Sequence, residues 1–96
     1  MKYVGFWEFC PENLDKVIEK NNQVIAERKT GSKKFGTVIC GPFGLGGEMK
    51  GFTVYEFDDH EQYANIALHY TPLMSWKFVP ILESSKIIEL WHKMKK

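Results

Sequence analysis

Two glutamates are the residues of this chain best suited to acid–base chemistry. Glu8 and Glu56 each stand in an apolar and aromatic run, and each comes one residue before the last aromatic of that run. Two carboxylates in a partly apolar cleft repel each other, so one of them tends to hold a proton near neutral pH. A carboxyl group tuned in this way serves as a general acid or base. We therefore predict Glu8 and Glu56 as catalytic residues, with a wet sheet rim and lysine partners as the alternative environment.

Three further residues are expected to line a pocket beside these carboxylates. Phe6 and Val54 belong to the same two runs, and His69 lies near the end of a predicted helix. Such a pocket suits a small, partly apolar molecule. The glycine-rich run 41–50 is expected to be a hairpin loop near its mouth, with a mobile flap as the alternative. It is not a phosphate loop, because it lacks the Gly-Lys-Ser/Thr ending and leads into a strand.

The remaining chemically active residue types do not form a recognisable site. No two of His60, His69 and His92 have the i, i+4 spacing of helical metal ligands, so no metal and no cofactor is predicted. Cys10 and Cys40 have no CxxC partner and are expected to be reduced, buried, small apolar residues. We expect the strands that carry them to run in opposite directions, which separates their Cα atoms beyond the ~7 Å limit of a disulfide.

The elements that must position these residues follow from hydrophobic periodicity. Alternation of two predicts strands, and apolar stripes at helical spacing predict helices. The expected strands are residues 2–9, 34–40, 52–57 and 76–82. The first helix is expected to begin at Pro11 and end near Lys29, and the second runs from about His60 to a stop at Pro72. A third helix is expected to start with Ser84 or Ser85 as its cap.

This order, β-α-β-β-α-β plus a helix, predicts one α+β domain over residues 1–96. Two split β-α-β halves pack as a ferredoxin-like, four-stranded antiparallel sheet with both helices on one face and the strand order 4-1-3-2. Pro80 suggests that the last strand lies at a sheet edge. We expect the first and third strands to be parallel neighbours, which would bring Glu8 and Glu56 together.

Composition narrows the possible partners. The net charge is +1, from 13 basic and 12 acidic residues spread along the chain, so no nucleic-acid footprint is present. No apolar run reaches the ~18 residues of a membrane span, and no signal peptide is visible, so a cytoplasmic location is expected. Aromatic residues make up 15% of the chain, more than a small monomer core easily absorbs. We therefore predict a homodimer whose interface buries the surplus.

Several short motifs carry a resemblance that covers the whole chain. They are Met1-Lys2-Tyr3 into Trp7, Pro11-Glu12-Asn13, Gly41-Pro42, Val54-Tyr55-Glu56 before Asp58-Asp59, and Val79-Pro80-Ile81-Leu82. On these residues the chain resembles the dimeric α+β-barrel superfamily, and within it a small bacterial and archaeal family of unknown function. The resemblance implies that two subunits place their open sheet faces together. Superfamily members include cofactor-free monooxygenases, isomerases and ligand-sensing domains, and fold alone chooses none of them.

Two alternative functions are therefore expected. In the first, this uncharacterised protein binds or transforms a small molecule in a barrel pocket, in the manner of a cofactor-free oxygenase or isomerase. The second is a non-enzymatic dimerisation or ligand-sensing module. A cleft of ~300 Å³ or more that holds both carboxylates would favour the first.

Overall fold

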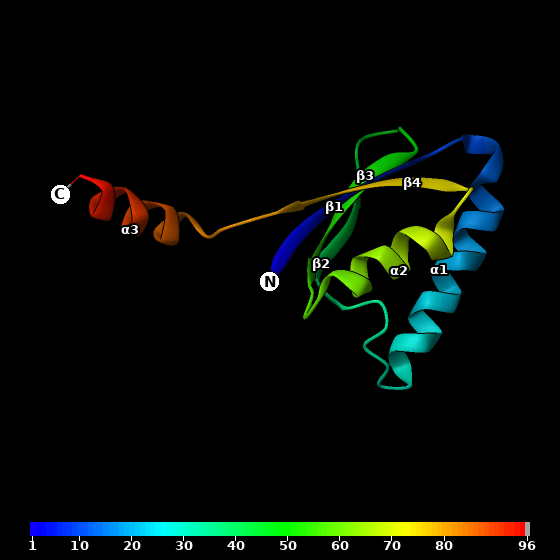
Figure 1. Ribbon diagram of the computed structural model, residues 1–96. Helices are drawn as coiled ribbons and strands as arrows, with labels where there is room; N and C mark the ends of the chain where they lie inside the picture. The colour runs from blue at the N-terminus through cyan, green and yellow to red at the C-terminus, as the bar shows by residue number, and fades with distance from the viewer. Residues whose placement is uncertain (96) are drawn as a thin grey trace.

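The computed structural model describes residues 1–95 as one sheet, two helices against it, and a third helix that stands apart (Figure 1). The strands are β1 (Lys2–Phe9), β2 (Thr37–Gly44), β3 (Lys50–Glu56) and β4 (Met74–Pro80). The helices are the short η1 (Pro11–Asn13), α1 (Leu14–Lys29), α2 (His60–Tyr70) and α3 (Ser84–Met94). Types and order of the elements match the prediction.

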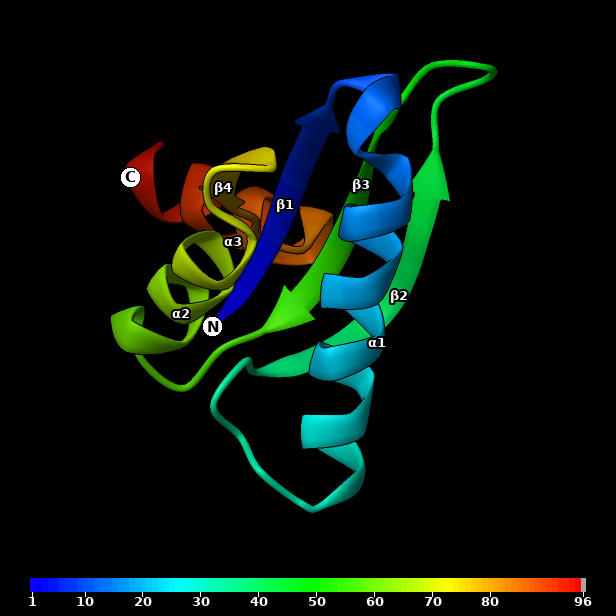
Figure 2. The same ribbon diagram turned by 90° about the vertical axis from the view of Figure 1, so that its right-hand side faces the viewer.

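The sheet has the order β2-β3-β1-β4, which is the predicted 4-1-3-2 seen from the other edge. Helices α1 and α2 lie on the same side of it (Figure 2). This is the ferredoxin-like arrangement. Strand β4 lies at an edge, as the proline at its last position suggested.

The predicted directions of two strand pairs are wrong. β1 pairs antiparallel with β3, and β2 also pairs antiparallel with β3, so β1 and β2 are parallel to each other. The reason is the connection through α1, which brings β2 back in the direction of β1 before the β2–β3 hairpin reverses the chain. A strand between two parallel strands in an antiparallel sheet must oppose both of them.

The two sides of the sheet carry different side chains, because successive residues of a strand point to opposite faces. On the helix face lie Tyr3, Trp7, Thr53, Tyr55, Trp76 and Phe78. On the open face lie Val4, Phe6, Glu8, Phe43, Phe52, Val54, Glu56, Lys77 and Val79. The core forms under the helices, where Phe57 and Ile66 are the largest fully buried side chains. No element of the described residues covers the open face.

Local capping follows the sequence at two helices. The Asp59 Oδ1 accepts hydrogen bonds from the backbone N–H groups of Glu61 and Gln62, at 2.9 and 3.2 Å, so Asp59 caps α2. Helix α1 ends at Lys29, and Gly31 has a φ of 87° that suits the closing turn. The expected serine cap of α3 is wrong, since Glu83 precedes the helix and makes no side-chain cap bond.

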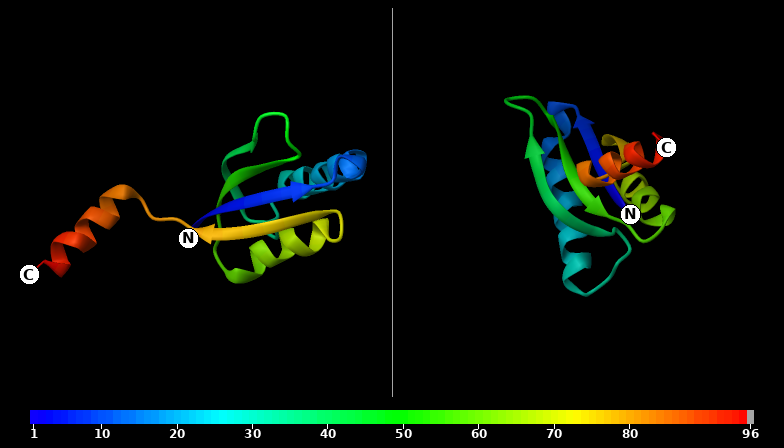
Figure 3. Two further views of the ribbon diagram at one scale, coloured as in Figure 1. Left: turned by 90° about the horizontal axis from the view of Figure 1, so that it is seen from above. Right: turned by 90° about the vertical axis from the view of Figure 1, so that its left-hand side faces the viewer.

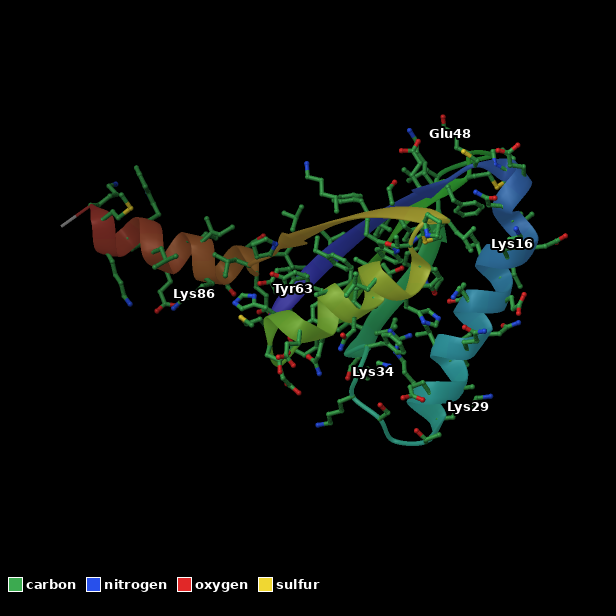
Figure 4. All side chains as sticks on the ribbon, turned by 45° about the vertical axis from the view of Figure 1, so that its right-hand side comes forward. Lys16, Lys29, Lys34, Glu48, Tyr63 and Lys86 are labelled. Atoms are coloured by element: carbon green, nitrogen blue, oxygen red, sulfur yellow. The ribbon has the colours of Figure 1, made fainter. Side chains whose placement is uncertain are left out.

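Strand β2 differs most from its expected bounds. It starts at Thr37, and Phe35 is instead buried in the core with its carbonyl bound by the Arg28 Nη2 at 3.2 Å. The strand continues to Gly44 through two register shifts between Val38 and Phe43. Much of the expected loop is therefore strand, and the connection to β3 is only residues 45–49, with Glu48 near its tip (Figure 4).

The two cysteines are free, but both are exposed, so their predicted burial is wrong. Cys40 pairs through Val54 with Val4, and Cys10 lies six residues beyond Val4. At the usual rise per strand residue, that offset is about 20 Å. This distance is too long for a disulfide. The reason that we expected, opposite directions of the two strands, does not apply, because β1 and β2 are parallel.

Candidate functional site

The predicted pair of carboxylates does not form. Glu8 lies opposite Lys50, whereas Glu56 lies opposite Lys2 at the other end of the same strands. The six-residue offset along β1 places the two about 20 Å apart. The Glu56 Oε2 is instead 2.9 Å from the ammonium of Met1. Antiparallel pairing thus puts each glutamate at its own rim of the open face, and the shared-proton mechanism has no geometric basis in one chain.

The three other predicted site residues are divided between the two sides of the sheet. Phe6 and Val54 lie on the open face, where the Phe6 and Phe52 rings are 6.4 Å apart. His69 lies on α2, with its Nε2 3.2 Å from the carbonyl oxygen of Lys20 and its ring 5.2 Å from that of Phe35. Phe6 and Val54 therefore lie on the same face of the sheet as the two glutamates, and His69 lies on the other side.

Glu8 does lie in a hollow of about 360 Å³ at one end of the open face. Its neighbours there include Phe6, Ser75, Lys50 and Lys77, so the lining of the hollow carries charges of both signs. Glu56 has no part in this hollow. A cleft large enough for the first expected function is present, but it holds only one of the two carboxylates.

A largely apolar cavity lies on the helix face, between α1 and the sheet. Its volume is about 170 Å³. Aromatic and aliphatic side chains dominate its wall: Trp7, Phe9, Leu14, Val17, Ile18, Val38, Pro42, Tyr55, Tyr70, Met74 and Trp76, with Asn21 and Thr53 as polar members. We call this cavity the helix-face pocket. None of its lining residues carries a formal charge at neutral pH.

The polar atoms in the wall include two bonded pairs and one unpaired donor. The Trp7 Nε1 donates to the Thr53 Oγ1 at 3.2 Å, and the Tyr70 hydroxyl donates to the Asn21 Oδ1 at 3.1 Å. The Nε1 of Trp76 is buried and has no hydrogen-bond partner among residues 1–95. An indole N–H only donates, and leaving it buried and unpaired costs about 1–3 kcal/mol. Trp76, one of the lining residues, thus carries an indole N–H that lacks an acceptor among the described residues.

The two tyrosines of the wall, Tyr55 and Tyr70, have pKa values above that of an ordinary tyrosine and keep their protons to higher pH. Burial raises the pKa of Tyr70, and the neighbouring Tyr55 adds to the effect. Burial also raises the pKa of Tyr55, against a lowering contribution from its hydrogen bond with Thr53 and from the nearby Arg28. Both phenols are thus neutral hydrogen-bonding groups at physiological pH. The wall offers apolar contacts and neutral polar groups but no ready proton acceptor.

The sequence-based prediction did not include this pocket, because it was based on charged residues of the strands. One signal was visible: Asn21 is the single polar residue in the apolar stripe of α1, and a polar residue there needs a partner. That partner, Tyr70, comes from α2, and its proximity depends on how the two helices lie on the sheet. Trp7 and Trp76 are cross-strand partners, but only the observed register shows it.

Comparison with known proteins gives a family but no activity. A family profile described as "Domain of unknown function (DUF3303)" matches residues 1–95. The chain belongs to the DUF3303 family. No curated protein and no solved structure matches it. The function of this DUF3303 chain therefore has to be argued from its own geometry.

The described part of this DUF3303 chain lacks both a metal-binding cluster and a membrane-spanning helix. Among residues 1–95, no group of three or more His, Cys, Asp and Glu side chains is arranged to hold a metal ion. None of the helices in that range is both long enough and apolar enough to cross a bilayer. The helix-face pocket remains the candidate site with the clearest chemistry.

Proposed function

We propose that this DUF3303 chain binds a small, largely apolar ring compound in the helix-face pocket. The supporting observation is the cavity of about 170 Å³ with its aromatic wall. An engineered apolar cavity of about 150 Å³ in another protein binds benzene, so this volume suits a single ring with a short substituent. Drug-sized ligands need at least about 300 Å³, which excludes larger molecules unless α1 moves.

The unpaired indole N–H defines the polar part of the ligand. A carbonyl or similar acceptor on the ring compound would satisfy the Trp76 Nε1, which has no partner among residues 1–95. Charged ligands are disfavoured, because a charged group that enters this apolar cavity loses its hydration and finds no opposite charge to compensate for the loss. The expected ligand class is therefore a neutral monocyclic aromatic ketone, aldehyde or amide.

Binding is favoured over proton transfer. Glu8 and Glu56 lie on the other face of the sheet, and the pocket tyrosines have raised pKa values that keep them neutral. A general base needs a pKa near the working pH and a position within hydrogen-bond reach of the substrate. A ligand-sensing or carrier role fits these groups better than oxygenase-like or isomerase-like chemistry.

We expect acetophenone to bind about tenfold more tightly than α-methylstyrene, in which a CH2 group replaces the carbonyl oxygen and no acceptor is left. The measurement is a titration of the ¹⁵N-labelled chain by NMR. Shifts should concentrate on the indole N–H signals of Trp7 and Trp76 and on the backbone of the pocket wall. Equal affinity for the two compounds would remove the proposed role of the Trp76 donor.

Two isoleucines of α1 provide a matched control for the location. Ile18 and Ile25 are seven residues apart on one side of the helix and are similarly exposed, but only Ile18 lines the pocket. The Ile18→Trp variant should weaken acetophenone binding at least about tenfold by filling the cavity, and Ile25→Trp should leave it unchanged. The proposal fails if wild type shows no saturable binding or if the two variants bind equally well.

A second candidate function is association with another copy of this chain through the open face. The observation that favours it is the exposed aromatic cluster there: Phe6 and Phe43 are 43% and 50% exposed, and both pack against Phe52. A contiguous apolar patch is costly in water and usually marks an interface. This arrangement would form the dimeric α+β barrel that the sequence resembles. The two functions are compatible, because the helix-face pocket lies on the other side of the sheet.

Charges at the rims suit such self-association. Glu8 lies opposite Lys50 at one end of the open face, and Glu56 lies opposite Lys2 at the other end. An apolar centre with both signs of charge at its rim is complementary to a second copy of itself. Analytical ultracentrifugation should find wild type dimeric at micromolar concentration, and a monomer there would remove this candidate.

A further inference from the structure

Helix α3 is amphipathic, but within residues 1–95 no other element packs against it. Its apolar side carries Ile87, Ile88, Trp91 and Met94, which are 54% to 79% exposed. Figures 1 and 3 show α3 standing clear of the sheet and of the other two helices. A short helix of this kind gains most of its stability from packing of the apolar side, so a partner is required.

The segment before α3 is held in a direction that leads away from the sheet. The backbone N–H of Ile81 donates to the carbonyl of Lys2 at 3.0 Å, which continues the β1–β4 pairing. The Lys2 Nζ then lies 2.7 Å from the Glu83 Oε1, at the residue before the helix. Both contacts lie directly before Ser84 and fix the direction in which the chain enters α3. The partner of α3 is therefore sought outside this chain.

The amount of uncovered surface matches that of a dimer. The chain exposes 6750 Å², whereas a compact monomer of 11.2 kDa exposes about 5,700 Å². Its radius of gyration is 15.6 Å, against about 12.5 Å for a compact chain of 96 residues. The excess is about 1,000 Å² per chain, or about 2,000 Å² for two chains. Stable interfaces bury about 1,200–2,000 Å² in total.

We propose that α3 is an arm that packs its apolar side on a second copy of this chain and extends the contact between the two open faces. The inference rests on the association function proposed above. By two-fold symmetry each copy gives one α3 and receives one, so both unpartnered surfaces are covered by the same event. Ile87, Trp91 and Met94 form the binding side of the arm, being spaced along one side of the helix.

Charge on the arm favours a protein partner over a lipid surface. Lys86 and Lys93 lie 3.7 and 3.5 Å from Glu89, so two basic groups on the polar side of α3 are already paired with a carboxylate. A helix that binds anionic lipid depends on unpaired basic residues on its polar side. The open face beside it carries Glu8 and Glu56 among its lysines, so it does not present a uniformly positive surface to anionic headgroups.

Two matched double variants test the arm. In I87E/M94E, two glutamates are added seven residues apart on the apolar side, and in S85E/H92E the same two charges are added on the opposite side. We expect I87E/M94E to weaken dimerisation about 100-fold or more, because two apolar side chains lose their buried environment. S85E/H92E should stay within about twofold of wild type. Both should keep the wild-type melting curve in their monomeric form, since α3 lies outside the core.

Mixed dimers provide an independent readout. In a sample of ¹³C-labelled and unlabelled chains, isotope-filtered NOEs should connect the Ile87 and Ile88 methyl groups to protons of the unlabelled copy. NOEs from these methyls only to their own chain would overturn the arm, because α3 would then fold back. A dimer that both double variants leave equally intact would also overturn it, while the association function would survive.

A monomeric wild type at micromolar concentration would overturn both the arm and the association function. Co-sedimentation of such a monomer with phosphatidylserine vesicles, abolished in I87E/M94E but kept in S85E/H92E, would assign α3 to a lipid surface instead.

Discussion

Replacing Phe57 with alanine is expected to lower the free energy of unfolding by about 3–5 kcal/mol. Phe57 is completely buried, and four aromatic rings surround its ring at centroid distances of 5.1 to 5.8 Å: Tyr3, Tyr55, Tyr63 and Phe78. These neighbours come from three strands and from α2, so a cavity there cannot close without moving several elements. A chain of this size has only about 5–15 kcal/mol of total stability, and this loss removes a large part of it.

Urea denaturation followed by circular dichroism measures the effect of Phe57→Ala. Leu68→Ala is the control: Leu68 is 72% exposed on α2, so its truncation should cost less than about 0.5 kcal/mol. A loss below about 1.5 kcal/mol for Phe57→Ala would mean that the aromatic core under the helices is not packed as described.

The Gly51→Ala variant is expected to destabilise the chain by about 3 kcal/mol, the upper end for added atoms in a packed interior. Gly51 is buried in β3, between Gly44 of β2 and Trp7 of β1. A Cβ atom there would overlap the backbone carbonyl of Phe43 and lie 2.6 Å from the Trp7 ring. A backbone carbonyl cannot rotate away as a flexible side chain can, so the β2–β3 pairing has to shift.

Gly47→Ala is the matched control for this substitution. Gly47 lies in the loop between the same two strands, and a Cβ atom there meets nothing within 4 Å. Neither of these two glycines has a positive φ, so the comparison isolates the effect of space. Thermal unfolding should show a lower Tm for Gly51→Ala and no loss for Gly47→Ala. Similar melting curves for both variants would contradict the described register of β2 on β3.

Gly51 also connects stability to the proposed pocket. The Trp7 ring that an added Cβ would displace lines the helix-face pocket and donates its Nε1 hydrogen to Thr53. Any Gly51→Ala protein that folds should therefore bind acetophenone more weakly than Gly47→Ala does. A substitution at this position of β3 is thus expected to change the shape of the cavity beside α1.

Much of the fold could be predicted because its signals are local. Alternating apolar residues in β1 and β3, the Asp59 cap of α2 and the glycine after α1 each act within a few residues. The order of elements then restricted the topology to the ferredoxin-like sheet that the structure contains. Errors at β2 arose because Phe35 satisfies the strand pattern but is buried outside the sheet, through a long-range contact.

The candidate site was less accessible to sequence reasoning. The antiparallel direction of β1 and β3 was already implied by the predicted sheet, and it separates Glu8 from Glu56. Which polar group meets which could not be derived in the same way. The Asn21–Tyr70 bond joins two helices, and the Trp7–Thr53 bond depends on the register of two strands.

By itself, the sequence determined where helices and strands form, which face of each is apolar, and that more apolar surface is present than one small core can bury. These properties depend on residue type and on spacing along the chain. Only the tertiary structure decided that the glutamates lie at opposite rims, that a pocket is left between α1 and the sheet, and that α3 packs against no other element of residues 1–95. Those features depend on strand register, on helix packing and on the contacts of Lys2 with Ile81 and Glu83. They are set by residues far apart in sequence, and periodicity carries no information about such distances.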